Sequence, residues 1–133
     1  MKEFLFRAKS GQTWYYGGVY RKKVYDDRVG YPDYVWHWYI VTDDGDEYRI
    51  SPDTICQYTG LRDKNDTKIF KGDIVKTDNI ITPLGTDTFT IEFVEGNYYI
   101  CNDGAVATLR SWYEYVEVVG NIYDNPKKIN RRF

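Results

Sequence analysis

Apolar and polar residues alternate with a period of two along much of this chain, a pattern that predicts β-strands rather than helices. Residues 88–94 alternate strictly. The Gly-Asn pair at residues 96 and 97 then favours a tight turn into a second strand over residues 98–101. We therefore expect a β-hairpin in the second half of the chain.

The first half of the chain has a less regular pattern. Short strands are predicted at residues 4–7 and 14–16, the second ending in a bend at the two glycines that follow it. The polar residues 21–33 indicate an irregular loop. Residues 34–41 form the clearest strand of this half. Because both faces of that strand carry apolar side chains, we expect it to be covered on both sides, at least in part.

An Asp-Gly pair at residues 44 and 45 predicts a tight turn between this strand and a returning strand over residues 47–50. Pro52 has no N–H to donate to a sheet and interrupts the pattern. Another strand is expected over residues 54–61, and the charged residues 62–66 that follow are typical of a solvated turn. We expect this turn to separate two lobes.

The remaining segments complete a mainly β chain. Residues 67–70 and 74–77 are predicted as short strands, followed by a polar loop from residue 78 to residue 87. Residues 105–113 leave room for one short helix, and residues 115–123, rich in β-branched and aromatic side chains, are predicted as the last strand. The expected fold class is mainly β with at most one short helix.

The composition supports this fold class. Aromatic residues make up 18% of the 133 residues, with 14 Tyr, 4 Trp and 6 Phe, and flat rings fit well on a pleated sheet. The formal net charge of -2 argues against non-specific binding to duplex nucleic acid. Cys56 and Cys101 are too few for a disulfide framework, and we expect two buried free thiols in a reducing compartment. Neither a signal peptide nor a membrane span is predicted, so we expect a cytoplasmic protein.

Catalytic and metal-binding patterns are not found in the sequence. His37 is the only histidine, and no pattern places a nucleophile or an orienting partner beside it. The carboxylate-rich residues 43–47 lack the ligand spacing of a calcium loop, and a hairpin turn explains them. No phosphate-binding glycine motif occurs. We predict that the protein is not an enzyme and has no catalytic residues, metal site or cofactor.

Aromatic and basic residues crowd the first 40 positions and are the one feature with a functional interpretation. Rings on a sheet edged by cations can stack single-stranded bases, or can form a protein-binding hot spot, where Trp, Tyr and Arg are enriched. The simpler interpretation, which we favour, is that the rings fill the core between sheets and cover its rim. The candidate binding surface consists of Trp14, Tyr16, Arg21, Lys22, Lys23, Trp36 and Trp38.

Two stretches in the middle of the chain resemble the core signature of the YopX-like proteins, which phages and prophages of bacteria encode. Residues 57–65 have the sequence QYTGLRDKN, and residues 69–76 have the sequence IFKGDIVK. Residues 6–8 resemble the opening of the family, and residues 118–126, VVGNIYDNP, resemble its closing motif. The resemblance implies a mostly β fold and residence in the host cytoplasm, and it supplies no established biochemical role.

Two positions depart from the pattern of the family. Asp66 stands where the family often has glycine, and Cys56 stands where glycine is common before Gln57. Either change is compatible with a local variation in a turn or in packing.

The motifs also have a structural purpose. A glycine allows a sharp turn, and an aspartate beside it can accept hydrogen bonds from nearby amides. This turn, the hairpin and the final strand together are similar to an SH3-like barrel. We therefore expect an aromatic-rich N-terminal β portion over residues 1–62 and an SH3-like barrel portion with a C-terminal tail over residues 63–133, which can form one compact unit. The residues given a structural role are Gln57, Tyr58, Gly60, Gly72, Asp73, Gly120 and Asn121.

The sequence does not identify a biochemical function. Our hypothesis is a phage-encoded accessory protein that binds another protein or copies of itself. The alternative is a module that binds single-stranded nucleic acid by aromatic stacking. The net negative charge favours the protein partner, and no membrane partner is expected.

Overall fold

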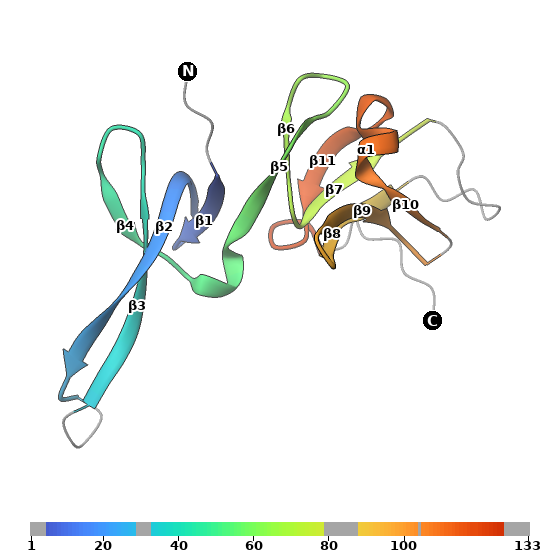
Figure 1. Cartoon of the computed structure of the whole chain (residues 1–133). Helices are drawn as coiled ribbons and strands as arrows, with labels where there is room; N and C mark the ends of the chain where they lie inside the picture. The colour runs from blue at the N-terminus through green and yellow to red at the C-terminus, as the bar shows by residue number, and fades with distance from the viewer. Residues whose placement is uncertain (1–4, 29–32, 79–87, 104, 127–133) are drawn as a thin grey trace. The chain divides into compact units, whose positions relative to one another are not determined.

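The computed structural model describes residues 5–28, 33–78, 88–103 and 105–126. The predicted fold class is confirmed, because the structure consists of antiparallel sheets with one short α-helix (Figure 1). The chain divides into two compact units, Met1–Gln57 and Tyr58–Phe133, each with its own hydrophobic core. Whether residues 1–62 and 63–133 act as two domains stays a prediction.

The first unit is an antiparallel sheet with the strand order β4-β3-β2-β1-β5. The short helix η1, Pro52–Thr54, lies where proline interrupts the strand pattern. The strand β5 begins in this unit, where Cys56 and Gln57 pair with β1, and continues into the second unit. The strand bounds are β1 Phe6–Ser10, β2 Thr13–Asp26, β3 Asp33–Val41, β4 Glu47–Arg49 and β5 Cys56–Arg62.

The strand β2 corrects two of the predictions. It does not bend at Gly17 and Gly18 but runs through them, and residues 21–26, predicted as loop, pair with β3 along their whole length. Residues 29–32 of the predicted loop lie outside the described residues. The polar residues misled the prediction because residues 21–26 pair with β3 alone among the described strands, and a two-stranded ribbon solvates its polar side chains as a loop does.

Gly17 allows β2 to continue past the end of β3. A Cβ atom built on Gly17 would lie 1.9 Å from the carbonyl oxygen of Val41, far inside any real contact distance. Gly18 has no atom within 4 Å of the same position. The close approach of the two backbones therefore requires glycine at residue 17 but not at residue 18.

The strand β3 was predicted to be covered on both faces, at least in part, and its first half is not covered. Only Ile40 is fully buried, where it joins Ala8 and Ile50 in the core of the unit. Trp38 packs against the edge of that core, while Tyr34 and Trp36 are half exposed. The core covers β3 only where β1 and β4 flank the ribbon.

The second unit contains a five-stranded antiparallel sheet with the order β10-β9-β8-β7-β11 and a short pairing of β5 with β6. The predicted β8–β9 hairpin and the one short α-helix are confirmed. An SH3-like barrel stays a prediction. The bounds are β6 Lys68–Phe70, β7 Asp73–Lys76, β8 Thr88–Val94, β9 Asn97–Cys101, β10 Val106–Thr108, α1 Leu109–Trp112, η2 Tyr113–Tyr115 and β11 Glu117–Asn121. The predicted loop at residues 78–87 falls outside the described residues from residue 79 onward.

The core of this unit is larger than that of the first. It contains seven buried apolar side chains, contributed by strands β6 to β9, by the short helix and by the segment before β11. These residues are Ile69, Val75, Phe89, Ile91, Ile100, Leu109 and Val116.

Asp63 corrects the prediction that residues 62–66 are wholly solvated. Its side chain is 6% exposed. One carboxylate oxygen accepts hydrogen bonds from the amides of Asn65 and Thr67, and the other accepts from the amide of Val118 at 2.8 Å. The buried carboxylate thus ties the turn to the start of β11, while Lys64, Asn65 and Asp66 remain exposed.

The motif around Gly72 and Asp73 forms the turn between β6 and β7. The buried Asp73 carboxylate accepts a hydrogen bond from the Phe70 amide at 2.8 Å. Gly72 has a φ of 86°, and its carbonyl accepts the amide of Ile122, just after β11. Asn121 pairs with Asp73, so backbone contacts connect this turn to the closing motif at residues 118–126.

Other motif residues also have structural contacts. Gly60, with a φ of 84°, lies where the β5–β6 register shifts between Tyr58 and Arg62. A Cβ on Gly120 would lie 2.5 Å from the side-chain oxygen of Asn125. The Asn121 side-chain oxygen accepts the amides of Tyr123 and Asp124, and Gln57 is exposed and pairs with Phe6. These contacts support the structural role of the motif, which stays a prediction.

Candidate functional site

The β2–β3 ribbon presents one face rich in rings and cations. Residues that pair across an antiparallel ribbon share a face, and successive residues on one strand alternate between faces. Arg21 pairs with Trp38, Lys23 with Trp36, and Tyr25 with Tyr34. We call these six residues the hairpin face: Arg21, Lys23, Tyr25, Tyr34, Trp36 and Trp38.

The cations of the hairpin face lie on its rings. The guanidinium carbon of Arg21 is 4.0 Å from the centroid of the Trp36 ring and 5.6 Å from that of Trp38. The ammonium nitrogen of Lys23 is 5.0 Å from the centroid of the Tyr34 ring. All three distances fall within the range of cation–π attraction, so the basic side chains are held over aromatic surface.

The outer rings of the hairpin face are open to solvent. Tyr25 is 53% exposed, Tyr34 is 55% exposed and Trp36 is 50% exposed. Tyr25 and Tyr34 meet edge to face, with their ring centroids 5.3 Å apart. The interpretation that these rings fill a core is therefore wrong for Trp36, although it holds in part for Trp38, which packs against the core of the unit.

The structure brings together four of the seven residues predicted for the candidate surface, namely Arg21, Lys23, Trp36 and Trp38. Lys22 lies on the opposite face of the ribbon, with its ammonium nitrogen 4.7 Å from the centroid of the Tyr39 ring. Trp14 and Tyr16 pair with β1, beyond the end of the hairpin face.

Trp14 and Tyr16 belong to a different hollow of the same unit. With Tyr15 and the turn residues Thr42, Asp43 and Asp44 they line a shallow recess of about 390 Å³. The guanidinium of Arg7 and the ammonium of Lys9 approach the Trp14 ring at 4.8 and 5.6 Å. These cations cover the ring from the β1 side, and the recess is a feature separate from the hairpin face.

Sequence reasoning missed Tyr25 and Tyr34 as members of the surface. The signal that finds them is the register of the ribbon, because Tyr25 comes two residues after Lys23 and Tyr34 two residues before Trp36. That register follows only once residues 21–26 are assigned to a strand.

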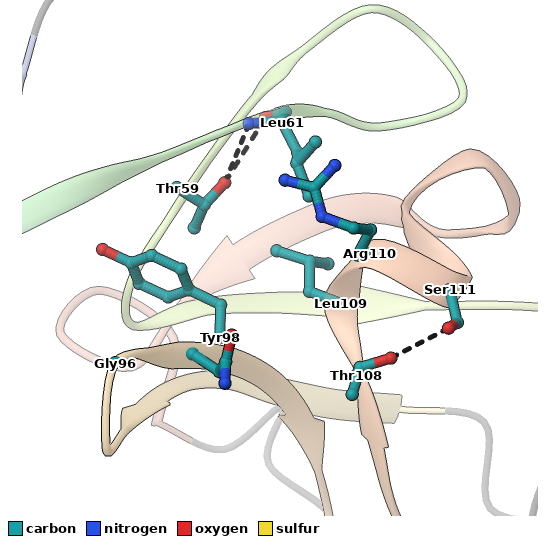
Figure 2. A pocket seen from close by; sticks show the side chains of 9 residues that line it. Thr59, Leu61, Gly96, Tyr98, Thr108, Leu109, Arg110 and Ser111 are labelled. Carbon is teal, nitrogen blue, oxygen red and sulfur yellow. Dashed lines mark hydrogen bonds between the residues drawn. The ribbon is translucent and has the colours of Figure 1, made fainter.

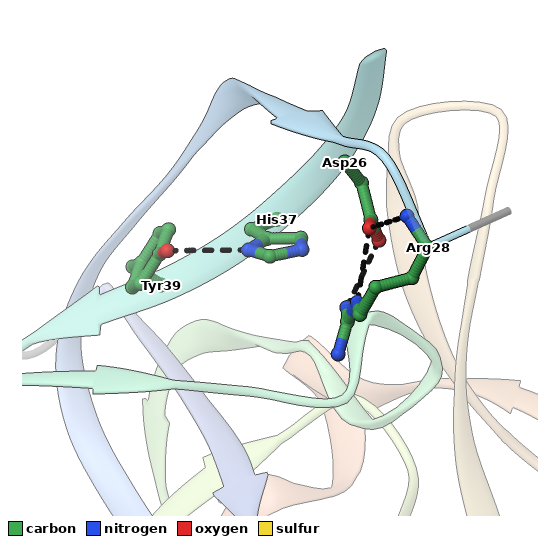
Figure 3. A network of polar contacts seen from close by, with 4 residues as sticks. All are labelled: Asp26, Arg28, His37 and Tyr39. Atoms are coloured by element: carbon green, nitrogen blue, oxygen red, sulfur yellow. Dashed lines mark hydrogen bonds and ion pairs between the residues drawn. The ribbon is translucent and has the colours of Figure 1, made fainter. Parts of the chain in front are cut away.

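The opposite face of the ribbon carries the only histidine of the chain (Figure 3). The ring nitrogen Nδ1 of His37 lies 3.5 Å from the Tyr39 hydroxyl, at the limit of a hydrogen bond. Asp26 accepts two side-chain hydrogen bonds from Arg28, both 2.9 Å long. These bonds hold the pKa of the Asp26 carboxyl well below its usual range. Arg28 thus keeps Asp26 ionised and engaged at the end of β2.

The second unit contains a cavity of about 430 Å³ next to the short helix (Figure 2). Hydroxyl groups on its wall are engaged within the protein, since Thr59 donates to the Ile69 carbonyl and Thr108 donates to Ser111. Arg110 is its only charged side chain, and burial raises the pKa of the Tyr98 phenol. The cavity is lined by Thr59, Leu61, Gly96, Asn97, Tyr98, Thr108, Leu109, Arg110 and Ser111.

Both cysteines are free thiols, as predicted, but only Cys56 is fully buried. Cys101 is half-buried, and burial together with the neighbouring Glu92 carboxylate raises the pKa of its thiol to about 11. Among the described residues, no three His, Cys, Asp or Glu side chains gather as a metal site would require. Within the same ranges, no helix has the length and apolar character needed to cross a membrane.

Comparison with known proteins extends these observations. The solved structure of protein EF1440 from Enterococcus faecalis is similar in fold, with a TM-score of 0.54 and 22% sequence identity over 95% of this chain and 97% of that chain. At this identity the likeness shows the fold alone. No curated protein matches the chain. The family model for the YopX protein matches residues 6–130, and YopX is not a known enzyme family. The chain therefore belongs to the YopX protein family.

Proposed function

We propose that this protein is a non-enzymatic, phage-encoded accessory protein that binds another protein through its hairpin face, in the cytoplasm of the bacterial host. The observation that carries the proposal is the half-exposed Trp36 ring beneath the Arg21 guanidinium, beside the exposed Tyr34. Trp, Tyr and Arg are the residues most enriched at the energetic centres of protein interfaces. Three large rings exposed side by side on one face are unusual for a surface that stays in water.

Single-stranded nucleic acid fits the face less well. A base stacks on an open ring face, but Arg21 lies on one face of Trp36 and Lys23 on one face of Tyr34. Trp38 is packed against the core. The formal net charge of -2 also opposes association with a polyanion.

A second copy of the chain fits less well than a different protein. The hairpin face carries the cations Arg21 and Lys23, whereas Asp26 and Asp33 are register partners on the opposite face, where the Asp26 carboxylate accepts hydrogen bonds from Arg28. Contact between two such faces would bring the cations of one copy close to those of the other, and the repulsion between like charges disfavours association. The proposed partner therefore bears negative charge.

The experiment is capture of proteins from a lysate of phage-infected bacteria, with quantitative mass spectrometry of the proteins retained. We expect a partner that the unmodified protein retains and that Trp36→Ala loses by 10-fold or more. Tyr115→Ala is the matched control, because Tyr115 is an aromatic residue of the second unit with 51% exposure, close to that of Trp36. Circular dichroism checks that both variants fold.

Equal retention by both variants and by the unmodified protein would contradict the proposal. Two further measurements test the other classes of partner. Saturable quenching of tryptophan fluorescence by a single-stranded oligonucleotide at low salt would favour nucleic acid. A dimer in sedimentation that Trp36→Ala abolishes would favour self-association.

A further inference from the structure

Along half of the length of β3, no described strand covers its outer edge. The strand β4 pairs with β3 only at Tyr39, Ile40 and Val41, and the Ile50 amide donates to the Trp38 carbonyl at 2.9 Å. Figure 1 shows β2 and β3 running on together past the ends of β1 and β4. No other described strand pairs with residues 33–37 on that side.

The pairing with β4 fixes which backbone groups point to this edge. In an antiparallel strand the N–H and C=O of one residue point to the same side, and those of the next residue point to the other side. Because the Trp38 carbonyl faces the β4 side, the N–H and C=O of Trp36 and of Tyr34 face it as well. The Tyr34 amide donates to the side chain of Asp33 at 2.7 Å. The groups left at the edge are therefore the N–H and C=O of Trp36 and the C=O of Tyr34.

The two edges of the ribbon are protected differently. Sheet edges that must stay unpaired usually carry lysine, proline or inward-pointing charge. The open edge of β2 carries the consecutive cations Arg21, Lys22 and Lys23. The open edge of β3 carries Tyr34, Val35 and Trp36, residue types that favour strands, and its one charged side chain, Asp33 at the start of the strand, is bonded to the Tyr34 amide. The edge of β3 is therefore the one suited to receive a strand.

The charges of the hairpin face extend toward the same edge. Arg21 and Lys23 belong to β2, yet their charged groups lie over Trp36 and Tyr34, which are rings of β3. Each cation reaches across the ribbon toward the side where an added strand would lie. Acidic side chains on that strand would meet two positive charges held in place by aromatic rings.

We propose that the outer edge of β3, from Tyr34 to Trp36, accepts an extended acidic segment of a partner protein as an added β-strand. This inference rests on the proposed function and names the chemistry of the partner. Backbone hydrogen bonds to Trp36 align the segment, and its acidic side chains face Arg21 and Lys23.

The probe for this inference is an eight-residue peptide of alternating glutamate and valine, capped at both ends, with the matching lysine–valine peptide as control. Amide hydrogen exchange of the protein is measured by NMR with and without peptide. We expect exchange of the Trp36 amide to slow by 10-fold or more with the acidic peptide. Exchange of the Val35 amide, which points toward β2, should not change. The lysine–valine peptide should leave both amides unchanged.

Two neighbouring lysines provide a matched pair of variants. Lys23→Gln removes a charge from the hairpin face and should weaken binding of the acidic peptide several-fold. Lys22→Gln removes a charge from the opposite face and should leave the affinity unchanged. Equal effects of the two variants would overturn the role of the hairpin-face charges.

Other outcomes separate this inference from the proposed function. Failure of the acidic peptide to bind at about 1 mM overturns the inference. So does binding without protection of the Trp36 amide. In both cases the proposed function still stands if Trp36→Ala loses a captured partner while Tyr115→Ala keeps it. If the variants capture equally, the proposed function itself fails.

Discussion

Asp63 shows how one buried carboxylate can tie together distant parts of a small unit. Asp63→Ala leaves the amides of Asn65, Thr67 and Val118 without their acceptor. We expect the free energy of unfolding to fall by about 3 kcal/mol, because leaving buried donors unsatisfied is costly. Chemical denaturation measures the change.

The matched control is Asp53→Ala. Asp53 is an exposed aspartate of the first unit, so its removal should change the free energy of unfolding by no more than about 0.5 kcal/mol. A similar small change for Asp63→Ala would contradict the assigned role of the carboxylate.

Asp66 and Glu95 adopt a backbone conformation that usually favours glycine. The φ of Asp66 is 65°, in the left-handed region, and Glu95 at the β8–β9 turn has a φ of 49°. We expect Asp66→Gly and Glu95→Gly each to raise the free energy of unfolding by about 0.5 kcal/mol. The contact of Asp66 with Arg62, 3.8 Å long and exposed, contributes little.

The control for these substitutions is Lys64→Gly in the same turn as Asp66. Lys64 is not among the described residues with positive φ, so glycine there only adds freedom to the unfolded chain and should destabilise the protein. If all three substitutions destabilise equally, backbone strain at Asp66 and Glu95 is not relieved by glycine.

At the scale of the element, the β2–β3 ribbon depends on one glycine. Gly17→Ala places a methyl group 1.9 Å from the Val41 carbonyl, so the two backbones must separate. We expect a loss of about 3 kcal/mol in the free energy of unfolding, measured by chemical denaturation.

Gly18→Ala provides the comparison at the next residue. A methyl group on Gly18 meets no atom within 4 Å, so its effect should stay within about 0.5 kcal/mol. Equal effects at Gly17 and Gly18 would show that the close approach of the two backbones does not matter for stability.

The strand β8 of the second unit was predictable because one side of its first half packs on the core and the other side does not. In β8, buried Phe89 and Ile91 alternate with half-buried or exposed residues, which is the pattern read from the sequence. The β2–β3 ribbon was harder to predict. Its outer half has no core on either side, so nothing in the polarity of residues 21–26 separates a solvated strand from a loop.

At the scale of the whole molecule, the sequence identified the fold class, the family resemblance and four members of the hairpin face. It did not identify their neighbours, because the cation–π contacts join residues 15 and 11 positions apart, Arg21 with Trp36 and Lys23 with Tyr34. Such contacts follow from strand register, and register is fixed by the pairing of the folded ribbon. Asp63 escaped prediction for the same reason, since its partner Val118 lies 55 positions away.

The two units differ in the size of their cores and in the aromatic surface that they expose. The core cluster of the second unit contains seven buried apolar side chains, whereas that of the first contains three, and large rings on the ribbon of the first unit are exposed. A two-stranded ribbon is marginally stable by itself in water. A partner that covers the hairpin face would add the buried surface that the first unit lacks.

The most direct test of the hairpin face is an NMR measurement on the indole N–H groups of the four tryptophans while a captured partner is added. We expect the Trp36 signal to shift or broaden at saturation, and the signal of Trp112, in the second unit, to stay in place. A bound partner that leaves the Trp36 signal unchanged would contradict the proposal that the partner binds the hairpin face.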